Sequence, residues 1–235
     1  MELFGLGNAA DLLYTASTWV LPVLIAITFH EAAHGYVAWQ LGDDTAYRLG
    51  RVTFNPVRHI DPIGTVVVPG ILLLSPIPFV FGWAKPVPVA FHRLHWPRRD
   101  MILVAAAGPG INLALAVVAA LLLNVTAVLP PSLANWVGLN LVHAILINLV
   151  LAIFNMLPLP PLDGGRVAVG LLPRQLAIPL ARLERFGLFI VIGAIFLLPM
   201  LGRQLGVELE VFDWLILRPI EWLLPFFQAL GGIGP

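Results

Sequence analysis

The sequence contains no cysteine, and only 11% of its 235 residues are charged. The missing cysteines exclude a disulfide-bonded scaffold, thiolate metal sites and a cysteine nucleophile. Because 13 basic residues are balanced by 13 acidic ones, there is no basic excess for neutralising phosphates, which excludes the usual nucleic-acid binder. The 59% hydrophobic content is too high for a disordered chain. A protein with several membrane spans remains.

Four apolar stretches are long enough to cross a bilayer as helices, which takes about 20 residues. They are residues 12–41, 101–129, 136–157 and 186–202. Two further stretches are ambiguous. Residues 63–83 carry three prolines and favour a broken or re-entrant segment. Residues 211–230 mix charges with Trp and Leu, which predicts an interfacial helix or a last span. We therefore expect an all-α polytopic membrane protein of about four to six transmembrane segments, folded as one domain over residues 1–235.

The distribution of basic residues predicts the orientation of these spans. Seven of them lie between the first and second spans: Arg48, Arg51, Arg58, Lys85, Arg93, Arg98 and Arg99. Four more follow the third span: Arg166, Arg174, Arg182 and Arg185. The short loop at 130–135 has none. By the positive-inside rule both basic regions are cytoplasmic and the N-terminus is outside.

The connection at residues 42–100 is expected to hold a small β structure. Residues 47–55 and 85–90 each resemble a short strand, with an apolar, turn-rich piece between them. Together they predict a membrane-associated β-hairpin beside the re-entrant segment. Residues 158–185 then form a proline-rich loop followed by an amphipathic helix.

The first span contains the pattern His30-Glu31-Ala32-Ala33-His34. Histidines four residues apart lie on one helix face, so both imidazoles can reach one metal ion. Glu31 lies beside the first histidine, where a carboxylate can take a proton from a metal-bound water. The alternative is two polar side chains that form hydrogen bonds inside a helix bundle, but ionisable residues in a membrane span are usually functional.

A catalytic zinc site normally has three protein ligands and an open fourth position, so one more ligand is needed. Asp163 is the preferred candidate because three prolines stiffen the segment before it and two glycines follow it. It could instead cap the helix that begins near Arg166. The other carboxylates that remain open are Asp43, Asp44, Asp61, Asp100 and Glu184.

Three motifs in order resemble the site-2 protease family of intramembrane zinc metalloproteases. They are the HExxH pattern, the segment Gly108-Pro109-Gly110-Ile111-Asn112, and the NxxPxPPLDGG pattern over residues 155–165. The segments 50–56, 59–62 and 82–89 resemble the compact branch of that family, which lacks PDZ and CBS domains.

The resemblance implies one zinc ion held by His30, His34 and Asp163, with Glu31 as the catalytic base. It also implies roles for Asn155 and Asn112, whose amides could donate to the oxyanion of the tetrahedral intermediate or hold the substrate backbone. Interhelical hydrogen bonding is the alternative for both asparagines.

The implied activity is zinc-dependent endopeptidase cleavage in or near transmembrane segments of membrane proteins, in a cell membrane and with the active site toward the cytoplasm. A substrate helix must unwind locally before hydrolysis, because its peptide bonds are covered by their own hydrogen bonds. We expect one strand of the hairpin to bind the unwound substrate by strand addition.

Two other functions remain compatible with the sequence. The ligand set could hold a transported metal ion, or the chain could be a non-catalytic homologue that binds membrane proteins. His143, in the third span, could be a proton relay, although a hydrogen bond to a neighbouring helix is the simpler interpretation.

Overall fold

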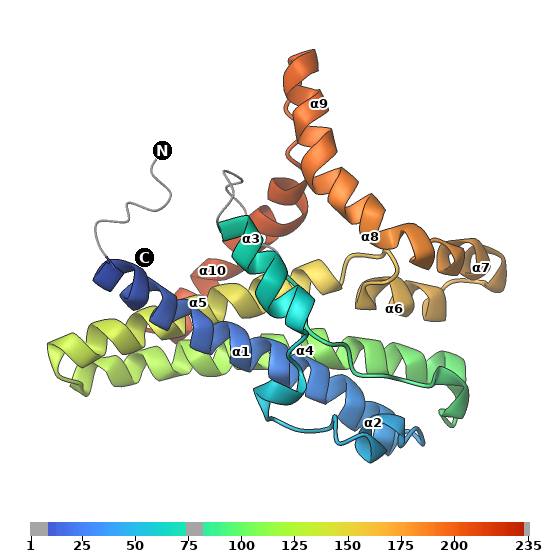
Figure 1. Cartoon of the computed structure of the whole chain (residues 1–235), viewed down its shortest axis with the longest axis horizontal. Helices are drawn as coiled ribbons and strands as arrows, with labels where there is room; N and C mark the ends of the chain where they lie inside the picture. Colours follow the sequence, from blue (N-terminus) through green and yellow to red (C-terminus); the bar gives the residue numbers. More distant parts are fainter. Residues whose placement is uncertain (1–8, 74–81, 233–235) are drawn as a thin grey trace.

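The computed structural model describes residues 9–73 and 82–232. Ten helices carry labels in Figure 1: α1 (Ala9–Gln40), α2 (Thr45–Arg48), α3 (Val68–Leu73), α4 (Pro97–Leu123), α5 (Pro131–Asn155), α6 (Asp163–Leu171), α7 (Arg174–Arg182), α8 (Glu184–Ile192), α9 (Leu198–Leu205) and α10 (Arg218–Leu230). Shorter helical turns occupy Pro56–Arg58, Pro62–Val67, Phe91–Arg93, Asn124–Val128, Gly193–Leu197 and Asp213–Leu217. These two ranges contain no β-strand.

The four long apolar segments are helical, as expected from their composition. The stretches long and apolar enough to cross a membrane are Leu13–Gln40, Pro97–Val128, Pro131–Asn155 and Glu184–Leu205. Both α4 and α5 begin with a proline, which suits the first helical position because its N–H would have no partner there. In α4, Asp100 also accepts the N–H of Trp96 and so caps the first turn.

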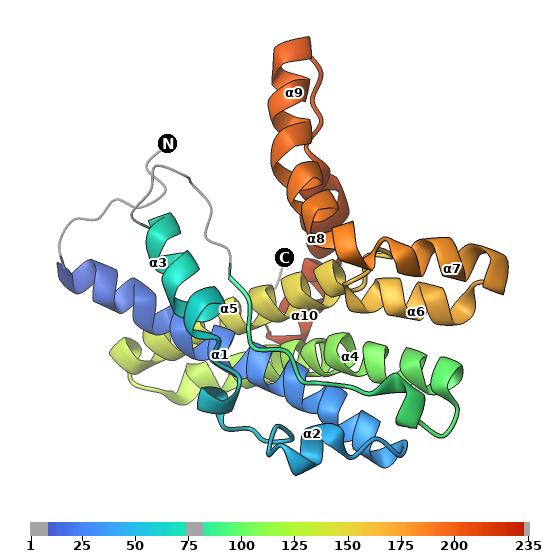
Figure 2. The same cartoon turned by 45° about the vertical axis from the view of Figure 1, so that its right-hand side comes forward.

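Helices α1, α4 and α5 pack pairwise against one another and form the core of the molecule (Figures 1 and 2). Small residues on α4, among them Ala116 and Ala120, are fully buried there and let the helices approach closely. Helix α10 covers α4 and α5 and buries Ile220 and Phe227 against them. Whether residues 211–230 cross the membrane stays a prediction.

The fourth span has a different setting. Residues 184–205 form a nearly continuous helix through α8 and α9, and this helix rises away from the bundle in both views (Figures 1 and 2). Helices α6 and α7 connect it to the end of α5. Near its start it packs against the proline-rich loop, because a Cβ at Gly187 would meet the Pro160 carbonyl oxygen.

The expected β-hairpin is wrong. Residues 45–48 form the helical turn α2, and residues 85–90 are extended but have no strand partner in the described part of the chain. Pro86 and Pro88 carry no N–H, so one edge of this segment cannot donate to a neighbouring strand. Three of its remaining donors bind other elements instead: the Val87 N–H donates to Glu31, the Ala90 N–H to Asp43 and the Lys85 N–H to the His59 carbonyl oxygen.

The stretch at residues 63–83 is only partly described. It is helical through residue 73, at the end of α3, and the remainder up to residue 81 lies outside the described residues. Pro76 and Pro78, two of the prolines that favoured a re-entrant path, fall in that part. The re-entrant path and the division of the chain into segments therefore stay predictions.

His143 forms the helix-to-helix hydrogen bond that we favoured for it. Its Nδ1 lies 2.9 Å from the Thr18 carbonyl oxygen of α1, and its ring stacks on Trp19 with 3.9 Å between ring centroids. The Thr18 carbonyl is free to accept because Pro22, four residues on, has no N–H to donate to it. This contact joins α5 to α1.

Candidate metal centre

The two histidines of the HExxH pattern lie one turn apart on α1 and face α4. Their Nε2 atoms are 3.1 Å apart, and the two rings meet edge to face. Gly108 of α4 stands opposite them, where a Cβ would lie 2.5 Å from His34 Nε2 and 2.6 Å from His30 Nε2. The glycine that opens the second motif therefore makes room for the two imidazoles.

Hydrogen bonds fix how each imidazole points. His34 Nδ1 lies 2.7 Å from the Val104 carbonyl oxygen, and His30 Nδ1 lies 2.5 Å from Asn112 Oδ1. Both partners are acceptors, so each Nδ1 carries the proton and each Nε2 presents a lone pair in the neutral ring. Metal-binding histidines are usually oriented in this way.

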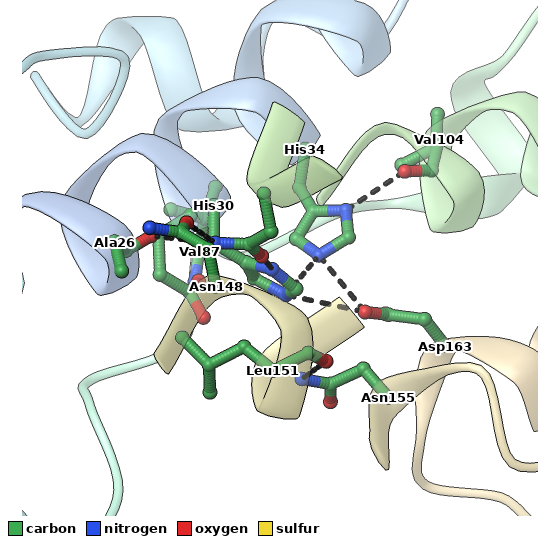
Figure 3. A network of polar contacts seen from close by, with 11 residues as sticks. Ala26, His30, His34, Val87, Val104, Asn148, Leu151, Asn155 and Asp163 are labelled. Atoms are coloured by element: carbon green, nitrogen blue, oxygen red, sulfur yellow. Dashed lines mark hydrogen bonds and ion pairs between the residues drawn. The ribbon is translucent and has the colours of Figure 1, made fainter. Parts of the chain in front are cut away.

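Asp163 completes the group from the other side (Figure 3). Its Oδ2 lies 3.2 Å from His30 Nε2 and 3.3 Å from His34 Nε2. This oxygen is buried and has no hydrogen bond of good geometry. As a metal ligand, this carboxylate would have to be ionised.

Close packing holds Asp163 in place. It is the first residue of α6 and follows the proline-rich loop that leaves α5. Two glycines after it touch backbone directly: a Cβ at Gly164 would lie 2.1 Å from the Met156 carbonyl oxygen, and one at Gly165 would lie 2.1 Å from the Pro160 nitrogen. The sequence motif thus specifies a tight fold of the chain around the carboxylate.

These three side chains fit a zinc ion. Two neutral imidazoles that point lone pairs at each other, beside a carboxylate oxygen without a hydrogen bond, need a cation between them. Tetrahedral zinc with bonds of about 2.0–2.1 Å would place its ligand atoms about 3.3 Å apart. The observed separations of 3.1, 3.2 and 3.3 Å match that spacing. Each of the three residues offers one ligand atom.

The other carboxylates that the sequence left open have partners elsewhere. Asp43, Asp61 and Asp100 each accept a backbone N–H from a residue near them in the sequence. Asp44 and Glu184 each form an ion pair with an arginine. Within the described residues, Asp163 is the carboxylate that groups with the two histidines.

Glu31 lies between His30 and His34 in the sequence of α1 and is half-buried. Its Oε2 accepts the Val87 N–H at 2.7 Å, so the extended segment 85–90 crosses directly over the carboxylate. That segment is held at other points too. Asp43 accepts the Ala90 N–H at 2.6 Å, and Arg51 donates to the Lys85 carbonyl oxygen at 2.6 Å.

The two candidate asparagines have different surroundings. Asn155 ends α5 on the side of Asp163, and one N–H of its amide donates to the Leu151 carbonyl oxygen (Figure 3). Its second N–H stays available for another acceptor. Asn112 is fully buried, and its Nδ2 donates to Ala26 and Asn148. Asn112 therefore has no N–H left for a reaction intermediate.

Three participants were not identified from the sequence: the Val87 N–H, the Val104 carbonyl and Asn148. The first two are backbone groups and leave no residue signal. Asn148 did leave one, because a buried amide in the middle of an apolar span needs a polar partner.

The sequence of this chain is similar to those of several known proteins. The model of Peptidase family M50 matches residues 131–199. A Bacillus subtilis (strain 168) protein named "Putative zinc metalloprotease YwhC" is 40% identical over 185 residues, which cover 77% of this chain and 80% of that protein. A Methanocaldococcus jannaschii protein named "Putative zinc metalloprotease MJ0611" is 30% identical over 70% of this chain and 75% of its own length.

A Mycobacterium tuberculosis (strain ATCC 25618 / H37Rv) protein named "Putative zinc metalloprotease Rip2" is 29% identical over 88% of this chain and 78% of its own length. No solved structure matches. The similarity to the B. subtilis protein covers most of both chains, and the apolar helices span a bilayer in length. The chain therefore belongs to the site-2 protease family, peptidase family M50, and is a multi-pass intramembrane zinc metalloprotease.

Proposed function

We propose that His30, His34 and Asp163 hold one zinc ion and that Glu31 is the catalytic base. The observation that carries this proposal is that one ligand atom from each of these three residues lies within 3.3 Å of the other two. Glu31 directly follows His30 in the sequence. The histidines come from α1 and the aspartate from the first position of α6, directly after the proline-rich loop.

The residues divide the hydrolysis between them. Zinc, when bound, supplies a Lewis acid that polarises the scissile carbonyl and lowers the pKa of a coordinated water. Glu31 takes the proton of the attacking water and delivers it to the leaving amine. The Val87 N–H holds the Glu31 carboxylate in one orientation. Asn155 donates its second N–H to the developing oxyanion.

The substrate is a membrane-protein segment that unwinds before cleavage, because a helix covers its own peptide bonds. A hairpin edge is no longer a candidate for binding it. The extended segment 85–90 remains one, since it crosses Glu31 and is anchored at both ends. Val89→Pro removes one N–H from this segment. Cleavage by that variant at the wild-type rate would remove the segment from substrate binding.

We place the active site toward the cytoplasm, because the basic segments that flank α1 and α5 are expected there. The absence of cysteine from the sequence makes this testable. Single cysteines at Arg58 and at Asn135 should react with a membrane-impermeant reagent from opposite sides of sealed vesicles. Labelling of both from one side would overturn the orientation.

Elemental analysis of the purified protein tests the metal site. We expect about one zinc per wild-type chain and a loss or strong weakening in His34→Ala and Asp163→Ala. Wild type that stays zinc-free after gentle purification with added metal would contradict the proposal. Glu31→Gln is the matched variant: it should keep its zinc and lose cleavage of a membrane substrate by orders of magnitude. Retained cleavage would move the base elsewhere.

A further inference from the structure

Two buried amides form hydrogen bonds that connect His30 to two further helices. Asn112 of α4 faces His30 of α1 with 2.5 Å between its Oδ1 and the His30 Nδ1, and it donates to Asn148 Oδ1 of α5 at 2.7 Å. Asn112 is 0% exposed and Asn148 2%. The three side chains thus form one polar chain inside an apolar bundle.

Backbone carbonyls fix the direction of every bond in this chain. Asn148 donates its Nδ2 to the Ala144 carbonyl oxygen at 2.8 Å, so its Oδ1 must face Asn112. Asn112 donates its Nδ2 to the Ala26 carbonyl oxygen at 3.2 Å and to that Oδ1, so its own Oδ1 must face His30. An amide oxygen can only accept. His30 must therefore carry its proton on Nδ1 and leave Nε2 free for the metal.

We propose that Asn148 is a positioning residue that acts through Asn112 to set the tautomer of His30. The inference rests on the proposed function, because a free Nε2 matters only if His30 is a zinc ligand. Without the acceptor oxygen of Asn148, Asn112 keeps one of its two donor bonds and its amide can rotate. A rotated amide presents an N–H to His30, which then needs its proton on Nε2, where zinc should bind.

A purely structural interhelical bond is the competing explanation, and α5 itself offers a matched control. Asn140 lies two turns before Asn148, is 8% exposed, and donates its Nδ2 to the carbonyl four residues earlier, as Asn148 does. Its Oδ1 has no hydrogen-bond partner. A half-open pocket of ≈ 250 Å³ borders both asparagines, so leucine would face the same pocket at either position.

The test compares Asn148→Leu with Asn140→Leu by two measurements. Nitrogen NMR of ¹⁵N-histidine in the zinc-free protein, assigned with a His30→Gln variant, reports which ring nitrogen of His30 carries the proton. Chelator competition with zinc alone measures the affinity of the site. We expect Asn148→Leu to shift protonation toward Nε2 and to weaken zinc binding about tenfold, the lower part of the range for groups that orient metal ligands. Asn140→Leu should match wild type in both.

Asn148→Ser serves if the leucine variant does not fold, since a hydroxyl can still bond the Ala144 carbonyl but is too short to reach Asn112. Equal tautomer populations and equal zinc affinities in the Asn148 and Asn140 variants would overturn the inference. If wild type bound no zinc, the proposed function would fail, whereas the tautomer measurement would still decide the role of Asn148.

Discussion

The two halves of the candidate metal centre are held by different forces. The histidine half lies on a long helix in the bundle, and hydrogen bonds to Val104 and Asn112 set the orientation of each ring. The aspartate half lies where the proline-rich loop enters α6, and no such bond reaches Asp163 Oδ2. There, prolines and glycines pack backbone against backbone.

This difference has a physical reason. A helical backbone is already rigid, so only the side-chain torsions need to be fixed, and directional hydrogen bonds do that well. A loop has a flexible backbone, so the chain itself must be restrained, which prolines and close glycine contacts achieve. A substitution that disturbs only the histidine side or only the aspartate side can therefore test each half of the metal centre on its own.

The largest effect is expected from Gly187→Ala, which acts on the aspartate half without touching a ligand. Its Cβ would lie 1.7 Å from the Pro160 carbonyl oxygen, so α8 or the loop must move. We expect zinc affinity to fall by about 100-fold or more and stability to fall by about 1–3 kcal/mol. Gly193→Ala, whose nearest neighbour is 3.9 Å away, is the control. Similar zinc affinities in both variants would refute the steric account.

Gly108→Ala tests the histidine half and should have a smaller effect. The three atoms nearest to the new methyl group belong to the ends of the His30 and His34 rings, which can rotate away without unfolding the bundle. Zinc affinity should fall about tenfold or more, while the thermal unfolding midpoint changes little. Gly110→Ala, two residues along α4 with nothing within 4 Å, should leave zinc binding unchanged. Chelator competition measures both.

Asp43→Asn tests how the segment over Glu31 is anchored. Burial raises the pKa of Asp43, but hydrogen bonds from Thr45 and Ala90 outweigh burial and lower it below the ordinary 3.8. The carboxylate therefore stabilises the fold fully above that pH, and the benefit is lost as the pH falls through the lower pKa of the folded state. We expect a destabilisation of about 1–3 kcal/mol near pH 7.

Thermal unfolding in detergent at pH 7 and near pH 3 checks this prediction. The difference in unfolding midpoint between wild type and Asp43→Asn should be smaller near pH 3 than at pH 7. Asp44→Asn is the control, because its ion pairs with Arg48 and Arg93 lie at the surface and contribute little. A difference in unfolding midpoint that grew on acidification would contradict a lowered pKa of Asp43 in the folded state.

The smallest effect is expected from His143→Phe, outside both halves. Phenylalanine keeps the stacking on Trp19 and loses the bond to the Thr18 carbonyl. Such bonds between membrane helices contribute about 0.6 kcal/mol on average. Zinc content and cleavage rate should equal those of wild type. A variant that folds but no longer cleaves would revive a proton-relay role for this histidine.

Sequence patterns predicted the long helices and the grouping of His30, His34 and Asp163 for identifiable reasons. Apolar runs specify spans, and a four-residue spacing places His30 and His34 on one face whatever the tertiary fold. Asp163 was preferred because prolines and glycines leave a local signature. In contrast, the residue pattern alone could not exclude the other carboxylates as the third ligand, because only tertiary packing brings Asp163 close to α1.

The remaining parts depended on partners that the sequence does not display. The strand prediction at 85–90 failed because the Val87 and Ala90 N–H groups bind the carboxylates of Glu31 and Asp43 rather than another strand. The orientation of Asn112 follows from the Ala26 carbonyl oxygen, a backbone atom of another helix. Backbone acceptors of this kind cannot be recognised from the residue types in a sequence.

The proposed ligand set is split between α1 and the start of α6, which has a consequence for biosynthesis. Chains fold progressively from the N-terminus as they are made, so the two histidines enter the bilayer long before Asp163 leaves the ribosome. A chain that stops after its first spans would hold two of the proposed ligands and the proposed base but not the third ligand. We therefore expect proteolytic competence only when α4, α5 and the start of α6 are in place, so that truncated products do not cleave the membrane proteins around them.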